Sequence, residues 1–412
     1  MIDKFFETSL CIDRFRRGPL AGHADNFAAL LCEQGYSRAS GQIRLRLIAG
    51  LNQWLERKRL GVEHLDERVL VRYLRYRERS RWCPKESAHT LGRFLETLRH
   101  AGVVPALNCP PVRDHRQEFL AEYRQYLLNE RGLSERTLPN VLVFVDRFLA
   151  EQFPKNQFTF AALRPIEITG FVQRHAAKLS SGRAKLLVTA LRNFFRYLRH
   201  RGDIETDLAG CVPSVAYWSL STLPKSLPRG SVERILKCCD RSTSQGRRDY
   251  AILMLLARLG LRSSEITGLN LEDMDWEIGQ ITILGKGGRW SKLPLPADVG
   301  QAVVDYLRHD RPRCSTRRLF VTRCAPITGL RSHDAINKTV ERSLAQAGID
   351  SVRKGAHLFR HTLASEMLHR GASLAEIGEV LRHRSANTTR IYAKIDLPAL
   401  QKLALPWPGG AA

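Results

Sequence analysis

The last third of the chain contains five short polar segments in a fixed order. They are Gly260-Leu261-Arg262-Ser263-Ser264-Glu265, Gly285-Lys286-Gly287-Gly288-Arg289, His357-Leu358-Phe359-Arg360-His361, Leu381-Arg382-His383 and, nine residues further on, Tyr392. Each string alone is typical of ordinary turns, helix ends or core positions. Their occurrence in order over one region indicates a single site that holds an anion.

The residue types in these segments suit the cleavage of a phosphodiester. That reaction needs a nucleophile, neutralisation of the charge that develops on the phosphate, and a proton for the departing oxygen. Arg262 and Arg360 suit the phosphate oxygens, because guanidinium groups bind such anions in pairs of hydrogen bonds and stay charged. His383 can donate a further hydrogen bond. Tyr392 is the candidate nucleophile, and its ordinary pKa of about 10 requires a base or a strongly cationic environment.

Three further residues complete the predicted site. We predict His357 as the base, and Lys286, in a glycine-rich turn, as the acid that protonates the leaving 5′ oxygen. Glu265 lies one helical turn after Arg262, on the same face, where a carboxylate can orient that arginine. His361 is interpreted as structural and is left out of the catalytic set.

This set of residues resembles the tyrosine recombinase (phage integrase, Xer-type) family, over residues 223–405. The resemblance implies that Tyr392 attacks the scissile phosphate, which leaves a 3′-phosphotyrosyl link and a free 5′-hydroxyl, and that a second strand reverses the step. It also implies that neither metal, ATP nor a cofactor is required. The expected partner is double-stranded DNA, bound by a homotetramer or by a complex with related recombinases, with residues 397–405 as a candidate segment for docking on a neighbouring subunit.

Two positions depart from the pattern of that family. Arg382 stands where glycine is usual, and Phe359 stands where leucine is commoner. Neither change removes a catalytic group. Arg382 adds bulk and charge, so the geometry of its turn is left open.

Composition points to a polyanionic partner. The chain has 412 residues, 43% of them apolar, and its 65 Lys and Arg against 41 Asp and Glu give a net charge of +24. Such an imbalance in a globular chain favours nucleic acid as the partner. Nine scattered cysteines without a CxxC pair suggest neither a zinc site nor a disulfide framework. With no predicted signal peptide or membrane span, we expect a soluble, cytoplasmic, nucleoid-associated bacterial protein.

Two proline-rich stretches, 103–111 and 211–230, predict linkers between three domains at about 1–105, 112–210 and 224–405. We expect a mainly α-helical chain with a small antiparallel sheet in the last domain. The second domain resembles the helical, SAM-like core-binding domain of tyrosine recombinases. The first has matching strings: Glu33-Gln34-Gly35 corresponds to Glu130-Arg131-Gly132, and Leu98-Arg99-His100 to Leu198-Arg199-His200. This similarity predicts a duplicated domain, with two unrelated helical bundles as the alternative.

In the third domain, residues 280–284 and 291–295 flank the glycine-rich turn and predict a hairpin. A further short strand is expected at 319–322, and helices at 297–309, 334–347, 357–370 and 374–381. The predicted contacts with DNA outside the active site are Arg183 and Lys185, which open a helix, and Arg289 in the hairpin.

The leading hypothesis is a site-specific recombinase, the integrase of a mobile element. A type IB topoisomerase, which uses the same residue set, and a DNA-binding accessory subunit whose own cleavage is dispensable are the alternatives.

Overall fold

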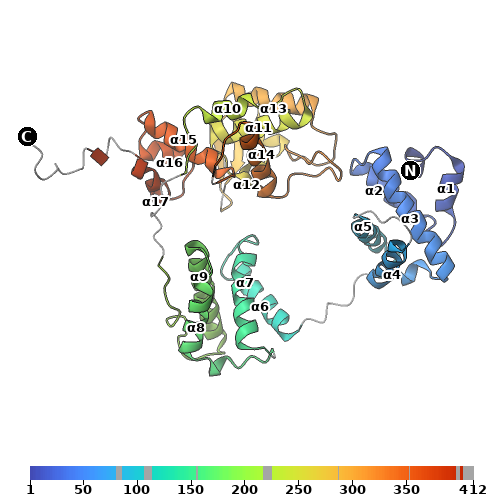
Figure 1. Cartoon of the computed structure of the whole chain (residues 1–412), viewed down its shortest axis with the longest axis horizontal. Helices are drawn as coiled ribbons and strands as arrows, with labels where there is room; N and C mark the ends of the chain where they lie inside the picture. Colours follow the sequence, from blue (N-terminus) through green and yellow to red (C-terminus); the bar gives the residue numbers. More distant parts are fainter. Residues whose placement is uncertain are drawn as a thin grey trace, which may run out of the picture. The chain divides into compact units, whose positions relative to one another are not determined.

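The computed structural model describes residues 1–79, 86–105, 114–154, 156–216, 225–285, 287–351, 353–395 and 400–401, without the side chains of residues 9–11. These residues confirm a mainly helical chain with one small antiparallel sheet in the last of its three helical blocks (Figure 1). By its contacts the chain divides into two compact units: residues 107–221, and residues 1–106 together with 222–412.

The first helical block has its own hydrophobic core, from Ile2 to Val104. Its elements are η1 (Ile2–Lys4), α1 (Ser9–Arg16), α2 (His23–Glu33), α3 (Arg38–Lys58), η2 (Val62–His64), α4 (Glu67–Glu78) and α5 (Ser87–His100). Polar side chains cap the N-termini of two of these helices. The Asp66 carboxylate accepts a hydrogen bond from the N–H of Val69 in α4 at 2.7 Å, and Ser37 caps α3. Helix α5 packs on α2, α3 and α4.

The second block repeats the order of elements from α2 to α5 and has no counterpart of η1 and α1 among its described residues. Its elements are α6 (His115–Asn129), α7 (Leu138–Gln152), η3 (Phe160–Ala162), α8 (Pro165–Ala176) and α9 (Ser181–Arg201), around a core from Phe119 to Val212. Helix α9 packs on α7 and α8, as α5 does on α3 and α4. Gly35 and Gly132 both adopt positive φ, 73° and 59°, as do Gly102 and Gly202, at 69° and 86°.

The third block contains the sheet. Its helices are α10 (Ser231–Lys237), α11 (Ser244–Leu259), α12 (Ser263–Gly268), α13 (Ala297–His309), α14 (His333–Gln346), α15 (His357–His369), α16 (Leu374–Val380) and α17 (Ala386–Thr389), with η4 (Leu271–Asp273) and η5 (Arg390–Ile395). The buried helix α11 packs against α13, α14 and α15.

The sheet has the order β1-β2-β3 and is antiparallel throughout, with strands β1 (Met274–Asp275), β2 (Gln280–Leu284) and β3 (Trp290–Pro294). Ile281 and Ile283 of β2 face the core, opposite Leu293 and Ser291 of β3. The predicted hairpin is confirmed, with β3 one residue earlier than expected. The strand expected at 319–322 is wrong, because the region makes only isolated bridges, Asn270 with Arg318 and Val321 with Gly329.

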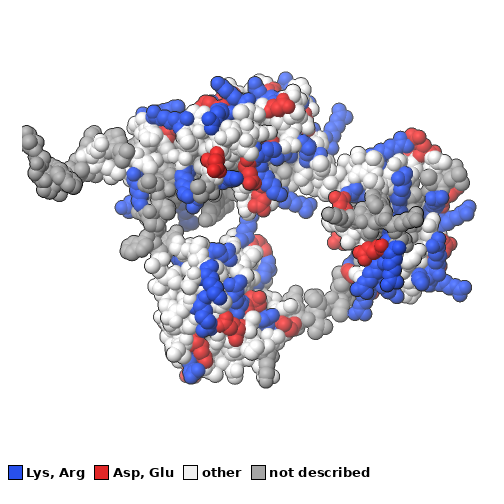
Figure 2. All heavy atoms as spheres, in the orientation of Figure 1, with Lys and Arg blue, Asp and Glu red and all other residues white. Residues whose placement is uncertain are grey.

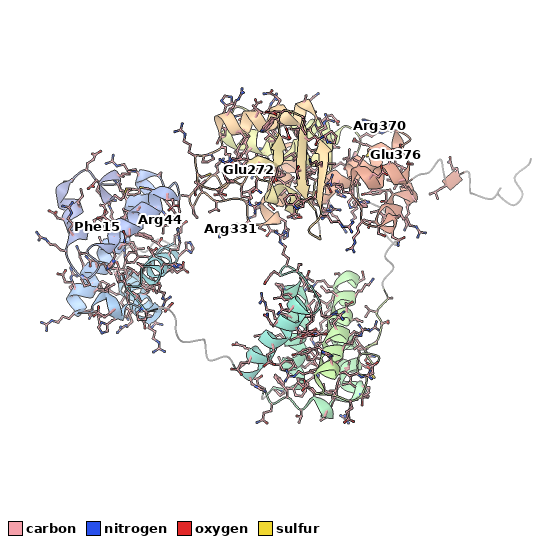
Figure 3. All side chains as sticks on the ribbon, turned by 180° about the vertical axis from the view of Figure 1, so that it is seen from behind. Phe15, Arg44, Glu272, Arg331, Arg370 and Glu376 are labelled. Carbon is pink, nitrogen blue, oxygen red and sulfur yellow. The ribbon has the colours of Figure 1, made fainter. Side chains whose placement is uncertain are left out.

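A smaller hydrophobic cluster joins the last helices. Ala364 of α15, Ile377 of α16, Leu381 and Tyr392 of η5 form it. Figure 3 marks this part of the chain by Arg370, just after α15, and by Glu376 in the first turn of α16. The cluster brings the segment that carries Tyr392 against α15, which carries Arg360.

Candidate active site

Helix α12 presents Arg262 together with its carboxylate partner. Arg262 is the N-cap residue of α12, and its backbone N–H donates to Oε2 of Glu265 at 2.8 Å. The Arg262 Nη1 donates to Oε1 of the same carboxylate at 2.7 Å. The Glu265 side chain is only 1% exposed and that of Arg262 is 21% exposed. The carboxylate therefore orients a partly exposed guanidinium group, the geometry that the spacing predicts.

Arg382 is a second guanidinium partner of the same carboxylate. Its Nη2 donates to Glu265 Oε2 at 3.1 Å, and its Nη1 donates to the Val380 carbonyl at 3.1 Å. Arg382 has a φ of +54°, in the left-handed region that costs a non-glycine residue about 1–2 kcal/mol. The turn thus keeps the backbone conformation that glycine favours, and the arginine side chain turns into the site. Sequence reasoning missed this role.

Arg360 joins three of the sequence segments. It is buried on α15, and its Nη1 donates to the Gly260 carbonyl at 2.6 Å while its Nη2 donates to the Leu381 carbonyl. Gly260 has a φ of +57°, and a Cβ there would lie 2.8 Å from Cδ2 of Leu381. The positive φ and this close contact both favour glycine at the position before Leu261 and Arg262.

The cluster carries more positive than negative charge. Burial, followed by the charges of Arg262 and Arg382, lowers the pKa of Arg360 to about 9. Desolvation, followed by Arg360 and Arg262, lowers the pKa of His357, although its side chain is solvent-exposed. The one carboxylate within hydrogen-bond reach of these guanidinium groups, among the described residues, is Glu265. An anion placed between the guanidinium groups would relieve their repulsion.

Tyr392 lies beside this cluster, in η5, and is 1% exposed. Burial raises the pKa of its phenol to about 12, against the opposing charge of Arg360. Its hydroxyl lies 2.8 Å from Nδ1 of His361. Burial, followed by the charge of His357, lowers the pKa of His361 to about 4, so this imidazole is neutral at pH 7.

The histidine in contact with Tyr392 is thus His361, which the sequence analysis interpreted as structural. His357, the predicted base, lies one turn earlier on α15. Residues one turn apart share a helix face. That spacing was the only signal that could have placed His361 at the site.

The other predicted site residues are placed as follows. His383 Nδ1 lies 2.7 Å from Thr389 Oγ1, and burial followed by Arg360 lowers the pKa of His383 to about 4. Lys286 lies outside the described residues, while Gly287 and Gly288 beside it have φ values of 86° and 75°. Arg289 is exposed in the same turn, and its carbonyl accepts from the N–H of Gly285 at 2.7 Å.

Arg183 and Lys185 are both exposed, in the first two turns of α9. The Arg183 guanidinium carbon lies 5.2 Å from the centre of the Phe144 ring. These two residues belong to the compact unit 107–221, and the structure does not relate them to the cluster around Arg360.

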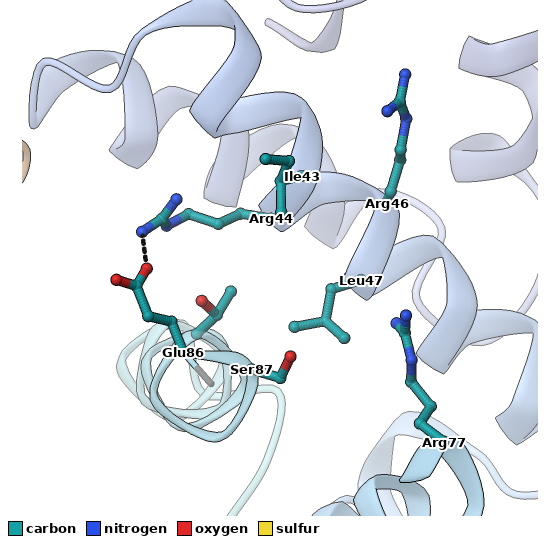
Figure 4. A pocket seen from close by; sticks show the side chains of 8 residues that line it. Ile43, Arg44, Arg46, Leu47, Arg77, Glu86 and Ser87 are labelled. Atoms are coloured by element: carbon teal, nitrogen blue, oxygen red, sulfur yellow. Dashed lines mark hydrogen bonds and ion pairs between the residues drawn. The ribbon is translucent and has the colours of Figure 1, made fainter. Parts of the chain in front are cut away.

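A pocket of about 290 Å³ lies apart from these residues, between α3, α4 and α5 (Figure 4). Arg44, on its wall, donates to Glu86 at 2.7 Å, and Arg77 donates to the Tyr73 hydroxyl at 3.4 Å. Both guanidinium groups are therefore engaged within the protein, and this pocket has none of the candidate catalytic residues.

Over the part of the chain that the structure describes, no group of three or more His, Cys, Asp or Glu side chains is arranged to hold a metal ion. No described helix combines the length and the apolar character needed to cross a membrane.

Comparison with known proteins relates the chain to one family. Residues 225–397 match the model of the phage integrase family, and residues 120–202 match that of the phage integrase N-terminal SAM-like domain. A Sinorhizobium fredii protein named "Putative integrase/recombinase y4rA" is 44% identical over 412 residues, 99% of both chains. The tyrosine recombinase XerC of Thermodesulfovibrio yellowstonii is 30% identical and covers 69% of this chain and 94% of its own.

Solved structures share the fold. The XerH site-specific recombinase in its post-cleavage complex with difH substrate has a TM-score of 0.55 at 22% identity, over 70% of this chain and 84% of its own. A lambda integrase fragment bound to a core site has a TM-score of 0.51 at 16% identity, over 67% of this chain and 94% of its own. The chain matches two family models in the family's domain order, and it is 44% identical to a full-length relative. It therefore belongs to the phage integrase family of tyrosine recombinases.

Proposed function

We propose that this chain is a site-specific recombinase that cuts and rejoins double-stranded DNA through a 3′-phosphotyrosyl intermediate at Tyr392. The observation that carries the proposal is the cluster of the buried Arg360 with the partly buried Arg262 and Arg382 around the single buried carboxylate of Glu265, next to Tyr392. The structural neighbours named as XerH, lambda integrase and Tn1549 integrase complexes contain DNA, which supports DNA as the partner.

In the proposed step, the Tyr392 oxygen attacks the scissile phosphorus and the bond to the 5′ oxygen breaks. The phosphate stays on the 3′ end as a phosphotyrosine ester, and the 5′ oxygen takes a proton from Lys286. Arg262 and Arg360 neutralise the charge that develops on the phosphate oxygens. A 5′-hydroxyl from a second strand then attacks the same phosphorus and releases Tyr392. One ester replaces another at each step, so the exchange needs no ATP.

The proton of Tyr392 needs an acceptor, since a phenol with a pKa of about 12 is neutral at physiological pH. His361 is neutral and touches the hydroxyl, so we assign it as the immediate hydrogen-bond partner. His357 and His383 stay in the proposed set. Burial, followed by the charges of Arg360 and Arg262, lowers the pKa of both, so both imidazoles are near the arginines that would bind the phosphate.

We also propose that the reaction integrates or transposes a mobile element. The names of the relative from Sinorhizobium fredii and of the neighbouring Tn1549 transposon integrase support this role. The proposed assembly is a tetramer on DNA or a complex with related recombinases. The docking segment expected at 397–405 lies outside the described residues, apart from 400–401.

The test is a nicked suicide substrate made from the ends of the parent element, incubated in EDTA with wild type or with Tyr392→Phe. Denaturing gels should show a covalent protein–DNA band with wild type alone, while both proteins shift the same DNA on native gels. Equal bands from both proteins, or no band from wild type that binds the DNA, would contradict the assignment of Tyr392. Relaxation of supercoiled plasmid without sequence preference would favour a topoisomerase.

A further inference from the structure

Helix α4 of the first helical block has a row of arginines on its exposed side. Arg68, Arg72, Arg75 and Arg79 recur at the spacing of one helix face, opposite the buried Val69, Leu70 and Tyr73. All four are exposed. A helix rises about 1.5 Å per residue, so neighbouring arginines of this row lie about 4.5 to 6 Å apart along the axis. We call these four residues the α4 arginine row.

The row lacks the acidic partners that an ordinary exposed helix face carries. Within the described ranges, no Asp or Glu forms an ion pair with any of the four. Two nearby acids have other roles, because Glu67 accepts from Arg99 at 2.7 Å and Asp66 caps the helix. The exposed Glu78 is on the same helix, and within the described ranges it forms no ion pair with the row. Like charges one turn apart destabilise a helix slightly. Four such residues without a counter-charge therefore indicate a partner that supplies negative charge.

The fold itself does not require arginine at these positions. If α4 is aligned with α8 from their first residues, the row corresponds to Ile166, Gly170, Gln173 and Ala177. Both helices pack on the last helix of their block in the same way. The arginines are therefore specific to the first block. Figure 2 shows Lys and Arg side chains gathered around this helix. A shallow groove beside it is lined by Arg68, Arg72 and Arg75 together with Asp66 and Glu67 of the first turn.

We propose that the α4 arginine row binds the sugar–phosphate backbone of double-stranded DNA and gives the first helical block a DNA-binding surface of its own. The inference rests on the proposed function, because DNA is the polyanion that the catalytic residues would act on. Guanidinium groups bind phosphate oxygens in a fork geometry, and a linear row of them follows a strand of regularly spaced phosphates. Contacts of this kind position the protein without reading sequence.

The test compares two full-length variants with the same loss of charge. In the first, Arg68, Arg72, Arg75 and Arg79 are replaced by Gln; in the control, the exposed Arg14, Arg17, Arg57 and Lys58 of the same block are replaced by Gln. Fluorescence anisotropy with a labelled duplex is recorded over a series of NaCl concentrations. We expect the slope of log affinity against log salt to fall by about 3.6 in the row variant and by less than 1 in the control, since each of four phosphate contacts contributes about 0.9.

Equal slopes for the two variants would overturn the proposal. Unchanged DNA binding together with lost binding of a poly-glutamate peptide would assign the row to an acidic protein instead. Covalent product from the suicide substrate at saturating protein should be the same in both variants, because none of the replaced residues belongs to the active site. That readout separates the two proposals: loss of the covalent band in wild type contradicts the proposed function, whereas equal slopes with the band intact contradict only the role of α4.

Discussion

At the scale of single residues, the site depends on one buried carboxylate shared by two arginines. Oε1 of Glu265 accepts a hydrogen bond from the Arg262 guanidinium, and Oε2 accepts one from the Arg382 guanidinium. Arg382 makes this contact from a backbone with a φ of +54°. In this chain the position where the family usually has glycine therefore adds a third guanidinium group to the site. The carboxylate fixes two of these groups while leaving the cluster with a net positive charge.

We therefore predict that Glu265→Gln lowers the rate of covalent DNA formation by about 10- to 100-fold, the usual effect of losing a partner that orients an active-site group. The amide keeps the shape of the side chain but removes the charge that holds Arg262 and Arg382 in place. The rate is measured on the suicide substrate at saturating DNA, and DNA affinity is measured beside it. Affinity should change by less than about threefold, because most contacts with phosphate lie elsewhere.

The matched control is Glu272→Gln, the same change at a carboxylate that pairs with Arg317 on the surface (Figure 3). Exposed pairs contribute little, so this variant should cleave like wild type. If Glu265→Gln also cleaved at the wild-type rate, the positioning role would be excluded. A purely structural role would instead lower the unfolding temperature without changing the rate at saturating DNA.

Much of this site was predictable from residue types and spacing, and the remainder depended on tertiary contacts. The pairing of Glu265 with Arg262 is local, since both residues belong to the first turn of α12. The contact between His361 and Tyr392 joins residues 31 positions apart, and that of Arg382 with Glu265 joins residues 117 apart. No periodicity in the sequence encodes such pairs.

At the scale of elements, the hairpin was predictable because its contacts are local, whereas the strand expected at 319–322 would have depended on residues far away in the sequence. Strands β2 and β3 enclose a glycine-rich turn, so their pairing is decided within a short stretch of chain. Residues 318 and 321 only bridge to Asn270 and Gly329, and β1 takes the edge of the sheet beside β2. Whether a segment forms a strand depends on the neighbours it pairs with, and the sequence of residues 319–322 does not specify such a partner.

The packing of α15, α16 and η5 predicts a stability that depends on pH. His361 and His383 both have pKa values of about 4 in the folded protein, below the ordinary 6.5, mainly because burial disfavours the charged imidazole. Between pH 6.5 and pH 4 the unfolded chain therefore binds more protons at these residues than the folded chain does. Their contribution to the free energy of unfolding is full above pH 6.5 and falls as the pH drops towards 4.

The measurement is the unfolding temperature of the full chain at pH 7.5 and at pH 5.0. The unfolding temperature of wild type should fall on acidification. In the double variant His361→Gln/His383→Gln this fall should be smaller than in wild type by about 2–4 °C. The exposed His309→Gln is the control and should behave like wild type. The same drop in all three proteins would show that these two imidazoles do not set the acid sensitivity.

At the scale of the whole molecule, three blocks each bury their own hydrophobic core, and the excess of positive charge is spread over them. A net charge of +24 is unfavourable for a compact protein unless a partner neutralises part of it. The buried cluster at Arg360 and the α4 arginine row are two places where such neutralisation would occur. Neither requires base-specific contacts, so both fit a protein that first binds DNA by charge.

If the protein first binds DNA by charge, its affinity for DNA should depend steeply on salt concentration. This dependence should be the same whether or not the protein can cleave DNA. Neutralising six to ten phosphates lowers affinity by about 10³- to 10⁵-fold between 50 and 200 mM salt, and we expect wild type to fall in this range. Tyr392→Phe should give the same slope, because the phenol, with its pKa raised to about 12, carries no charge at pH 7.5. Titrations of a labelled 40-base-pair duplex, read by anisotropy, measure both slopes. A slope near zero would mean that the positive charge does not meet phosphates. A steeper slope for Tyr392→Phe than for wild type would mean that covalent capture, which salt does not weaken, holds part of the wild-type complex.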